Sequence, residues 1–145
     1  MNHDNNSIPP PRKLITRVVK AGTVFTEAIS LVVKEEKITM QQFNVLRILR
    51  GRKGKPASLQ DVSKDMLHSN SNTTRVVDKL VAKELAERIQ CKNDRRQIEI
   101  TITDSGLKLL ARLDEKVDHR ERELVEALSE KEIKLLIETL SKLSY

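Results

Sequence analysis

A run of hydrogen-bonding side chains, Asn72-Thr73-Thr74-Arg75, is the part of this chain best suited to chemistry at a nucleic-acid surface. Asparagine can pair with an adenine edge, arginine can pair with a guanine edge, and a threonine methyl can contact a thymine methyl. The same residues also suit the solvated start of an ordinary helix. The predicted elements around the run therefore decide between a nucleic-acid contact and a solvated helix start.

Two short helices joined by a polar turn are predicted around this run. The first lies within residues 58–67, where Ser58 and Asp61 supply an N-cap and its partner three positions later. The second is expected to begin near Asn70 or Ser71, and its apolar face is formed by Val76, Val77, Leu80 and Val81. In a DNA-reading helix pair, the N-terminal part of the second helix enters the major groove. The expected DNA contacts from this helix are Ser71, Asn72, Thr73, Thr74, Arg75 and Lys79.

A hairpin with a basic tip is predicted directly after these helices. In residues 97–103, isoleucines alternate with polar residues, which indicates a strand with one buried face, and residues 87–91 supply its partner. The tip, residues 92–96, combines turn chemistry with three cations that can reach phosphate or a narrow minor groove. An isolated hairpin tip is usually only solvated, but after a helix-turn-helix it is typical of a winged DNA-binding domain. We therefore expect DNA contacts from Lys92, Arg95 and Arg96.

Over residues 12–145 the chain resembles the MarR family of winged helix-turn-helix transcriptional regulators. The resemblance lies in Thr39 with Gln42-Phe43-Asn44-Val45-Leu46, in Leu59-Gln60-Asp61-Val62, in Thr74-Arg75-Val76-Val77-Asp78-Lys79-Leu80, and in Asp94-Arg95-Arg96 and Thr103-Asp104-Ser105-Gly106. It implies that Arg96 enters the minor groove and that Asp94 restrains the wing arginine by a charge-assisted hydrogen bond. The family usually has glycine where this chain has Glu84, so the second helix must end without a glycine C-cap.

Positive charge is concentrated in the predicted winged part. Between Leu46 and Arg96 there are 13 lysines and arginines against 6 acidic residues, whereas the remaining 14 basic and 15 acidic residues give a net charge of −1. Such a distribution is expected of a phosphate-binding surface, whose affinity falls with salt. The loop Arg50-Gly51-Arg52-Lys53-Gly54-Lys55 is about equally suited to a backbone-phosphate contact and to simple solvation.

Composition predicts one domain with an aliphatic core, because the 145 residues include only two Phe, one Tyr and no Trp. The lone Cys91 cannot form an internal disulfide, and one thiol is too few for a protein-only zinc site. The three histidines are scattered and no glycine-rich phosphate loop is present, so we expect no metal, no cofactor and no catalysis. A polar N-terminus and the lack of a long apolar run favour the cytoplasm and no membrane contact.

Long helices are predicted on both sides of the winged part. Residues 1–11 suggest a flexible arm, residues 12–36 a helix with a wide apolar stripe, and residues 104–145 two further helices, the second beginning at Ser129 and Glu132. In the family resemblance, such terminal helices of two chains interlock. A two-fold DNA reader also needs rigid spacing between its recognition helices, which favours a homodimer over a monomeric helical subdomain.

The sequence therefore predicts a mainly α fold with a small β wing, in which residues 37–103 form the winged helix-turn-helix and residues 12–36 and 104–145 form dimerisation helices. The expected function is that of a homodimeric regulator, as a repressor, that binds a pseudo-palindromic site in double-stranded DNA. The resemblance also implies a small aromatic or phenolic effector, for which Phe25 and Phe43 could line a cleft or serve simply as core. The alternative is a protein-interaction module on a winged-helix scaffold, with an enzyme a distant third.

Overall fold

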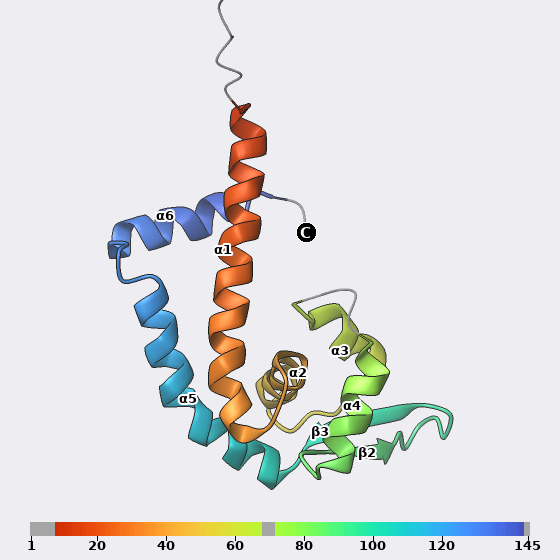
Figure 1. Ribbon diagram of the computed structural model, residues 1–145. Helices are drawn as coiled ribbons and strands as arrows, with labels where there is room; N and C mark the ends of the chain where they lie inside the picture. The colour runs from red at the N-terminus through yellow and green to blue at the C-terminus, as the bar shows by residue number, and fades with distance from the viewer. Residues whose placement is uncertain (1–7, 68–71, 144–145) are drawn as a thin grey trace, which may run out of the picture.

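The computed structural model describes residues 8–67 and 72–143, and in it the helix-turn-helix and the two-stranded wing follow one another in the predicted order between long terminal helices (Figure 1). The elements are α1 Pro10–Val33, η1 Lys34–Glu36, α2 Met40–Gly51, β1 Ala57–Ser58, α3 Leu59–Asp65, α4 Thr73–Ala82, β2 Ala86–Gln90, β3 Ile98–Ile102, α5 Asp104–Leu124 and α6 Glu130–Leu140. The mainly α class with a small β wing is confirmed. None of the described helices is both long enough and apolar enough to cross a membrane.

Helix α2 lies at the centre of the molecule and packs against α1, α3, α4, α5 and β3. Its first turn is fixed by a capping box, in which Thr39 accepts from the Gln42 backbone and Gln42 accepts from the Thr39 backbone. Phe43, Val45 and Leu46 are at most 2% exposed. The core around them is aliphatic, as predicted, with Phe43 as its one aromatic among the described buried residues.

The helix-turn-helix is confirmed, with one boundary corrected. Ser58 and Asp61 form the expected capping box, and α3 follows directly. Helix α4 begins at Thr73, later than the predicted start near Asn70 or Ser71, because the Asn72 side chain accepts a hydrogen bond from the Arg75 backbone and acts as the N-cap. The turn residues 68–71 lie outside the described part of the chain.

The hairpin is also confirmed, and a third strand joins it. β2 and β3 pair antiparallel, and β1 pairs with the other edge of β3 so that Ala57 lies opposite Ile100. Two residues are too few to show a period in sequence, which is why β1 was not predicted. The buried face of β3 was predicted too long, because Ile100 is fully buried whereas Ile98 is 48% exposed at the wing end, beyond the core helices.

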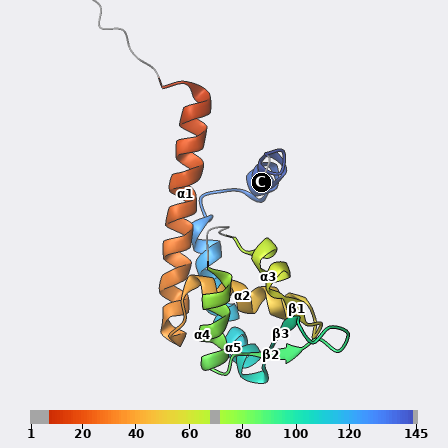
Figure 2. The ribbon, with the colours of Figure 1, turned by 90° about the vertical axis from the view of Figure 1, so that its right-hand side faces the viewer.

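The terminal helices differ from expectation at their ends. Pro10 and Pro11, which were assigned to the predicted arm, lie in the first turn of α1, where proline has no hydrogen bond to lose. Helix α5 ends at Leu124 rather than continuing towards Leu128. Helix α6 begins with the predicted capping box at Ser129, yet none of its residues is buried, and it stands apart from α1 (Figure 2).

Two ion pairs fasten α5 to η1 at the end of α1. Arg112 donates two hydrogen bonds of 3.0 Å to the Glu36 carboxylate, and the Lys116 ammonium lies 2.6 Å from Glu35. The hydrogen bonds from Arg112 lower the pKa of Glu36, and the hydrogen bond to Glu35 raises the pKa of Lys116. Ion pairs exposed to solvent contribute little to stability. Their main effect is to align α5 with the end of α1, against which it packs.

The end of α4 is closed by a Schellman motif with Glu84 in the position usually held by glycine. The Leu85 backbone donates to the Leu80 carbonyl at 3.0 Å, and the Glu84 backbone donates to the Val81 carbonyl at 2.9 Å. This geometry requires a left-handed residue, and Glu84 has φ +60°. An L-residue with a Cβ is disfavoured there by about 1–2 kcal/mol relative to right-handed backbone. The helix thus ends at the position that the sequence indicated, but in a strained conformation.

Replacing Glu84 by glycine should raise the free energy of unfolding by about 1 kcal/mol, because glycine adopts positive φ without steric cost. Urea denaturation of the two proteins would measure the change. Glu84→Ala is the matched control, since it removes the same carboxylate but keeps the Cβ and should give no comparable gain. Equal stabilisation by both substitutions would mean that the carboxylate, and not the backbone conformation, is the unfavourable feature.

Candidate DNA-binding surface

One side of α4 is polar and exposed, and we call it the α4 face. Its residues are Asn72, Thr74, Arg75 and Lys79. The opposite side of the helix carries Val77 and Leu80, both fully buried against the core. Because a helix with one apolar stripe must turn that stripe inward, burial of these two residues forces the α4 face outward. The sequence had assigned all four residues to DNA contact, and the fold brings them together.

One other predicted contact residue on this segment, Thr73, does not lie on the α4 face. Thr73 is only 7% exposed, and its hydroxyl lies 2.8 Å from the hydroxyl of Ser63 on α3. It therefore joins the two helices of the helix-turn-helix and has little surface to offer to a ligand. Ser71 lies outside the described residues.

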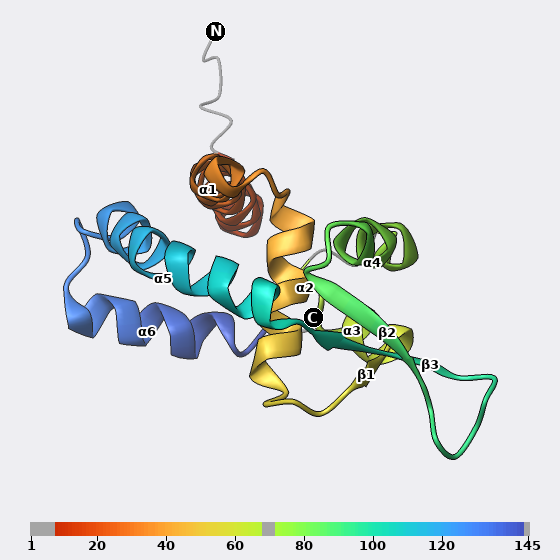
Figure 3. The same ribbon diagram turned by 90° about the horizontal axis from the view of Figure 1, so that it is seen from below.

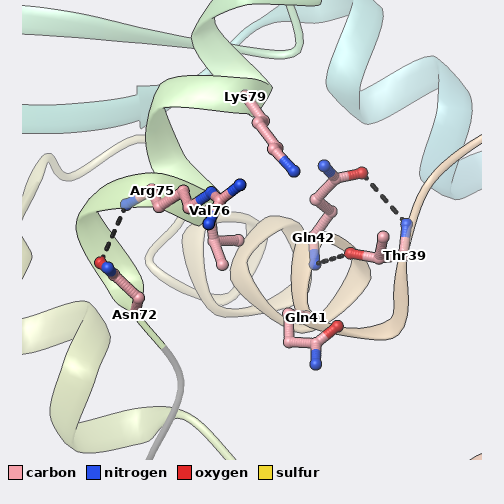
Figure 4. Close-up of a pocket in the computed structure, with 7 residues that line it drawn as sticks. All are labelled: Thr39, Gln41, Gln42, Asn72, Arg75, Val76 and Lys79. Atoms are coloured by element: carbon pink, nitrogen blue, oxygen red, sulfur yellow. Dashed lines mark hydrogen bonds between the residues drawn. The ribbon is translucent and has the colours of Figure 1, made fainter.

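A shallow pocket of about 330 Å³ lies between the α4 face and the start of α2 (Figure 4). It is lined by Thr39, Gln41, Gln42, Asn72, Arg75, Val76 and Lys79. The lining contains two cations and no carboxylate. Sequence reasoning missed the contribution of α2, although the Thr39 and Gln42 capping pair was visible as a signal for where that helix starts. The pocket is suited to an anionic group flanked by hydrogen-bonding amides.

The two cations of the α4 face differ from a nearby arginine in whether they form a salt bridge. In the described part of the chain no salt bridge holds Arg75 or Lys79, whereas the nearby Arg88 on β2 is paired with Asp78. Arg75 and Lys79 therefore keep their hydrogen-bond donors available to an external partner. Asn72 is partly committed, because its side-chain oxygen caps α4 and its amide group remains.

The wing projects beyond the helices at one end of the sheet (Figure 3). Its loop is closed by a hydrogen bond from the Cys91 backbone to the Gln97 carbonyl at 3.1 Å. Lys92, Arg95 and Arg96 are all exposed, and none forms a salt bridge within the described residues. The three predicted wing cations are thus presented together at the tip.

Asp94 acts on the wing in a different way from the one that was expected. The resemblance implied a charge-assisted bond to a wing guanidinium, but its carboxylate accepts the backbone N–H of Arg96 at 3.0 Å. The Gln97 backbone donates in turn to the Asp94 carbonyl at 3.0 Å. Asp94 therefore shapes the turn, as Asx turns do, and leaves the Arg96 side chain unrestrained by an ion pair.

The basic segment at the end of α2, residues 50–55, divides into two parts. Arg50 is paired with Asp114 of α5, through two hydrogen bonds of 3.0 and 2.8 Å, and Arg52 donates to the Pro56 carbonyl. Lys53 and Lys55 are exposed. The two arginines thus serve the fold, and only the two lysines remain available for phosphate.

The two phenylalanines predicted for a cleft have different environments. Phe43 is 2% exposed in the core, with the Arg47 guanidinium 5.4 Å from the centre of its ring. Phe25 is 41% exposed and lines a groove of about 200 Å³ between α1 and α5, together with Ile29, Glu121, Leu124 and Val125. Phe43 is therefore a core residue, and of the two phenylalanines only Phe25 has exposed surface that a ligand could contact. The described residues contain no cluster of histidine, cysteine and acidic side chains that could hold a metal ion.

Comparison with known proteins identifies the family. Residues 38–98 match the model of the MarR family. The chain is 35% identical to the HTH-type transcriptional regulator YpoP of Bacillus subtilis (strain 168) over 109 residues. This aligned region covers 75% of this chain and 76% of that relative. The chain belongs to the MarR family. It is therefore a DNA-binding transcriptional regulator with a winged helix-turn-helix, and members of this family are regulators rather than enzymes.

Solved structures of MarR-family proteins share the fold. A mutant of MarR from E. coli, complexed with operator DNA, superposes with a TM-score of 0.81 at 23% identity, covering 90% of this chain and 92% of that one. BpsR of Bordetella bronchiseptica, whose DNA binding is regulated by 6-hydroxynicotinic acid, gives a TM-score of 0.79 at 22% identity, covering 90% and 97%. Both likenesses extend over the terminal helices as well as the winged part.

The backbone role of Asp94 can be separated from a charge role by two substitutions. Asp94→Ala should weaken DNA binding about fivefold, since loss of one hydrogen bond in the turn costs about 1 kcal/mol. Asp94→Asn keeps an oxygen for the Arg96 backbone and removes a negative charge near phosphate, so affinity should be unchanged or higher. Fluorescence anisotropy with a labelled duplex at fixed salt would measure both. Equal loss in the two variants would instead support the guanidinium clamp.

Proposed function

We propose that this MarR-family regulator acts in the cytoplasm as a homodimeric, ligand-responsive repressor on a pseudo-palindromic operator. In this proposal, α4 of each copy enters the major groove, and the tip of each wing reaches the adjacent minor groove. The observation that carries it is the α4 face: Arg75 and the Asn72 amide lie at the exposed start of the helix and Lys79 lies one turn further on, and no salt bridge among the described residues holds these two cations or the three wing cations.

Arg75 is the residue that we assign to base reading. It lies in the first turn of α4, is exposed, and has its guanidinium free of any salt bridge in the described residues. A free guanidinium can bond two acceptors of a guanine edge at once, which discriminates against other bases by about 1–3 kcal/mol. Thr74 and the Asn72 amide are further candidates for base contact. Lys79 lines the pocket beside α2, where a phosphate would meet both a cation and amide donors.

The dimer proposal rests on apolar surface that one chain leaves uncovered. On α1 the exposed large apolar residues are Leu14, Ile15, Val18, Val19, Val24, Phe25 and Leu31, and after α5 they are Leu135, Leu136, Ile137, Leu140 and Leu143. Large exposed apolar surface on a protein commonly marks an interaction site. A second copy would cover both sets in an isologous interface and would set the distance between the two α4 faces.

The ligand proposal rests on the groove beside Phe25. Its volume of about 200 Å³ is adequate for a molecule with a single ring, since a cavity of about 150 Å³ can hold benzene. It lies between α1 and α5, the two helices whose arrangement would fix the spacing of the α4 faces. The neighbour BpsR, regulated by 6-hydroxynicotinic acid, supports an aromatic effector. Such a ligand acts only if it binds the DNA-compatible and incompatible arrangements unequally.

Binding of the full chain to a pool of random duplex DNA at two salt concentrations, followed by sequencing of the retained DNA, tests the proposal. We expect enrichment of a two-fold-related site, with retention falling as salt rises. Retention without sequence preference would contradict specific reading by α4. Failure of the folded protein to retain any duplex, with and without aromatic carboxylates, would favour the protein-interaction alternative.

Arg75→Ala should weaken binding to the selected site by about 1–3 kcal/mol and broaden the base preference at one position in each half-site. Arg122→Ala is the matched control, because it removes the same charge from an exposed position on α5. Repeating the selection with each variant measures both affinity and preference. Unchanged preference in Arg75→Ala, or an equal loss in the control, would remove Arg75 from base reading.

Leu136→Glu should disrupt the dimer, since it places a charge on the apolar side of α6 twice in a two-fold interface. Burial of one such side chain is worth about 1.5 kcal/mol or more, so the dimer dissociation constant should rise at least about a hundredfold. Sedimentation equilibrium measures it, with Lys134→Glu on the same helix as the control. A dimer equally stable in both variants would place the interface elsewhere.

A further inference from the structure

The C-terminal end of α4 is bonded to the junction between α1 and α2. The Lys83 ammonium donates to the Lys37 carbonyl at 2.5 Å and to the Gln42 side-chain oxygen at 3.3 Å. Lys37 is the left-handed residue on which η1 ends, and Thr39 then caps α2. Gln42 is only 3% exposed and its oxygen also holds the first turn of α2. Lys83 therefore fastens the end of α4 to a fixed point on the chain that leads out of α1.

The same end of α4 is bonded to the start of α5. The Thr103 hydroxyl donates to the Glu84 carbonyl at 2.7 Å and accepts the Gly106 backbone N–H at 3.1 Å. The Thr103 backbone donates to the Leu85 carbonyl at 3.1 Å. Gly106 lies so close to the backbone that follows α4 that a Cβ added to it would lie 2.3 Å from the Leu85 carbonyl oxygen. The two helices therefore meet backbone to backbone, with Thr103 linking them.

Both contacts lie at the opposite end of α4 from Asn72 and Arg75. Among the described residues, no other side-chain hydrogen bond joins α4 to α1, η1 or α5. A helix of 10 residues is about 15 Å long, so a tilt of about 5° at its C-terminal end would move its N-terminal end by about 1.3 Å. Small changes at the Lys83 and Thr103 contacts would thus be amplified at the α4 face.

We propose that Lys83 and Thr103 are positioning residues that fix the tilt of α4 relative to α1 and α5, and thereby the half-site spacing that the regulator accepts. The inference rests on the proposed function, because spacing matters only when two copies bind one duplex. Neither residue needs to contact DNA. Their effect is on which separation of half-sites is bound, and a residue that only stabilised the fold would not change that preference.

Two substitutions at Thr103 separate its cap from its link to Glu84. Thr103→Asp keeps an acceptor for the Gly106 backbone and remains a good N-cap, but it has no proton to donate to the Glu84 carbonyl. Thr103→Ser keeps both functions. The readout is affinity for the selected operator and for duplexes whose spacer is one or two base pairs longer or shorter. Thermal unfolding of each variant shows whether it folds cooperatively.

We expect the wild-type protein and Thr103→Ser to prefer one spacing, and the preference to fall about tenfold in Thr103→Asp, which corresponds to about 1.4 kcal/mol. Lys83→Met keeps the aliphatic stem and removes the ammonium, and it should reduce the preference in the same way, whereas Lys83→Arg should retain it. Because Lys83 is exposed, this second pair tests the proposal even if Thr103→Asp fails to fold.

Equal weakening at every spacing in Thr103→Asp and Lys83→Met would overturn the positioning role while leaving operator binding intact. The proposed function fails in a different way, since the wild-type protein itself would then show no preferred spacing or no duplex binding. That result would overturn the inference as well.

Discussion

The packing of five elements around α2 is the constraint on which the rest of the structure depends. α1, α3, α4, α5 and β3 all pack against this helix, and its side chains at Val45 and Leu46 have no exposed surface. Because α4 covers α2 with Val77 and Leu80, its polar side has only solvent to face. The α4 face is therefore a consequence of core packing. A close-packed core also means that a change in the tilt of α4 moves the elements packed against it as well.

Much of the fold could be predicted because its signals are local. The N-cap pairs at Ser58 and Ser129 and the alternation leading to Ile100 each depend on residues within one element. The parts that could not be predicted depend on contacts between elements. Burial of Thr73 requires α3 to lie against it, and exposure of Ile98 requires knowing where the core helices stop.

The candidate surface shows the same division. The cations of the α4 face and the wing were visible in sequence, because residue type and order suffice to propose them. The backbone role of Asp94 and the link from Lys83 to Lys37 were not, since the first depends on turn geometry and the second joins residues 46 positions apart. Charged residues at exposed positions can thus be predicted from the sequence, whereas the hydrogen bonds that orient the elements carrying them cannot.

The central claim is that two α4 helices read one duplex at fixed spacing while the wings contact the flanking minor grooves. Hydroxyl-radical footprinting of the wild-type protein on its selected operator tests it most directly. The account predicts two-fold-related protections about one helical turn apart, with minor-groove protections outside them that disappear in Arg96→Ala. A single continuous protection without two-fold symmetry, or outer protections unchanged in Arg96→Ala, would contradict it.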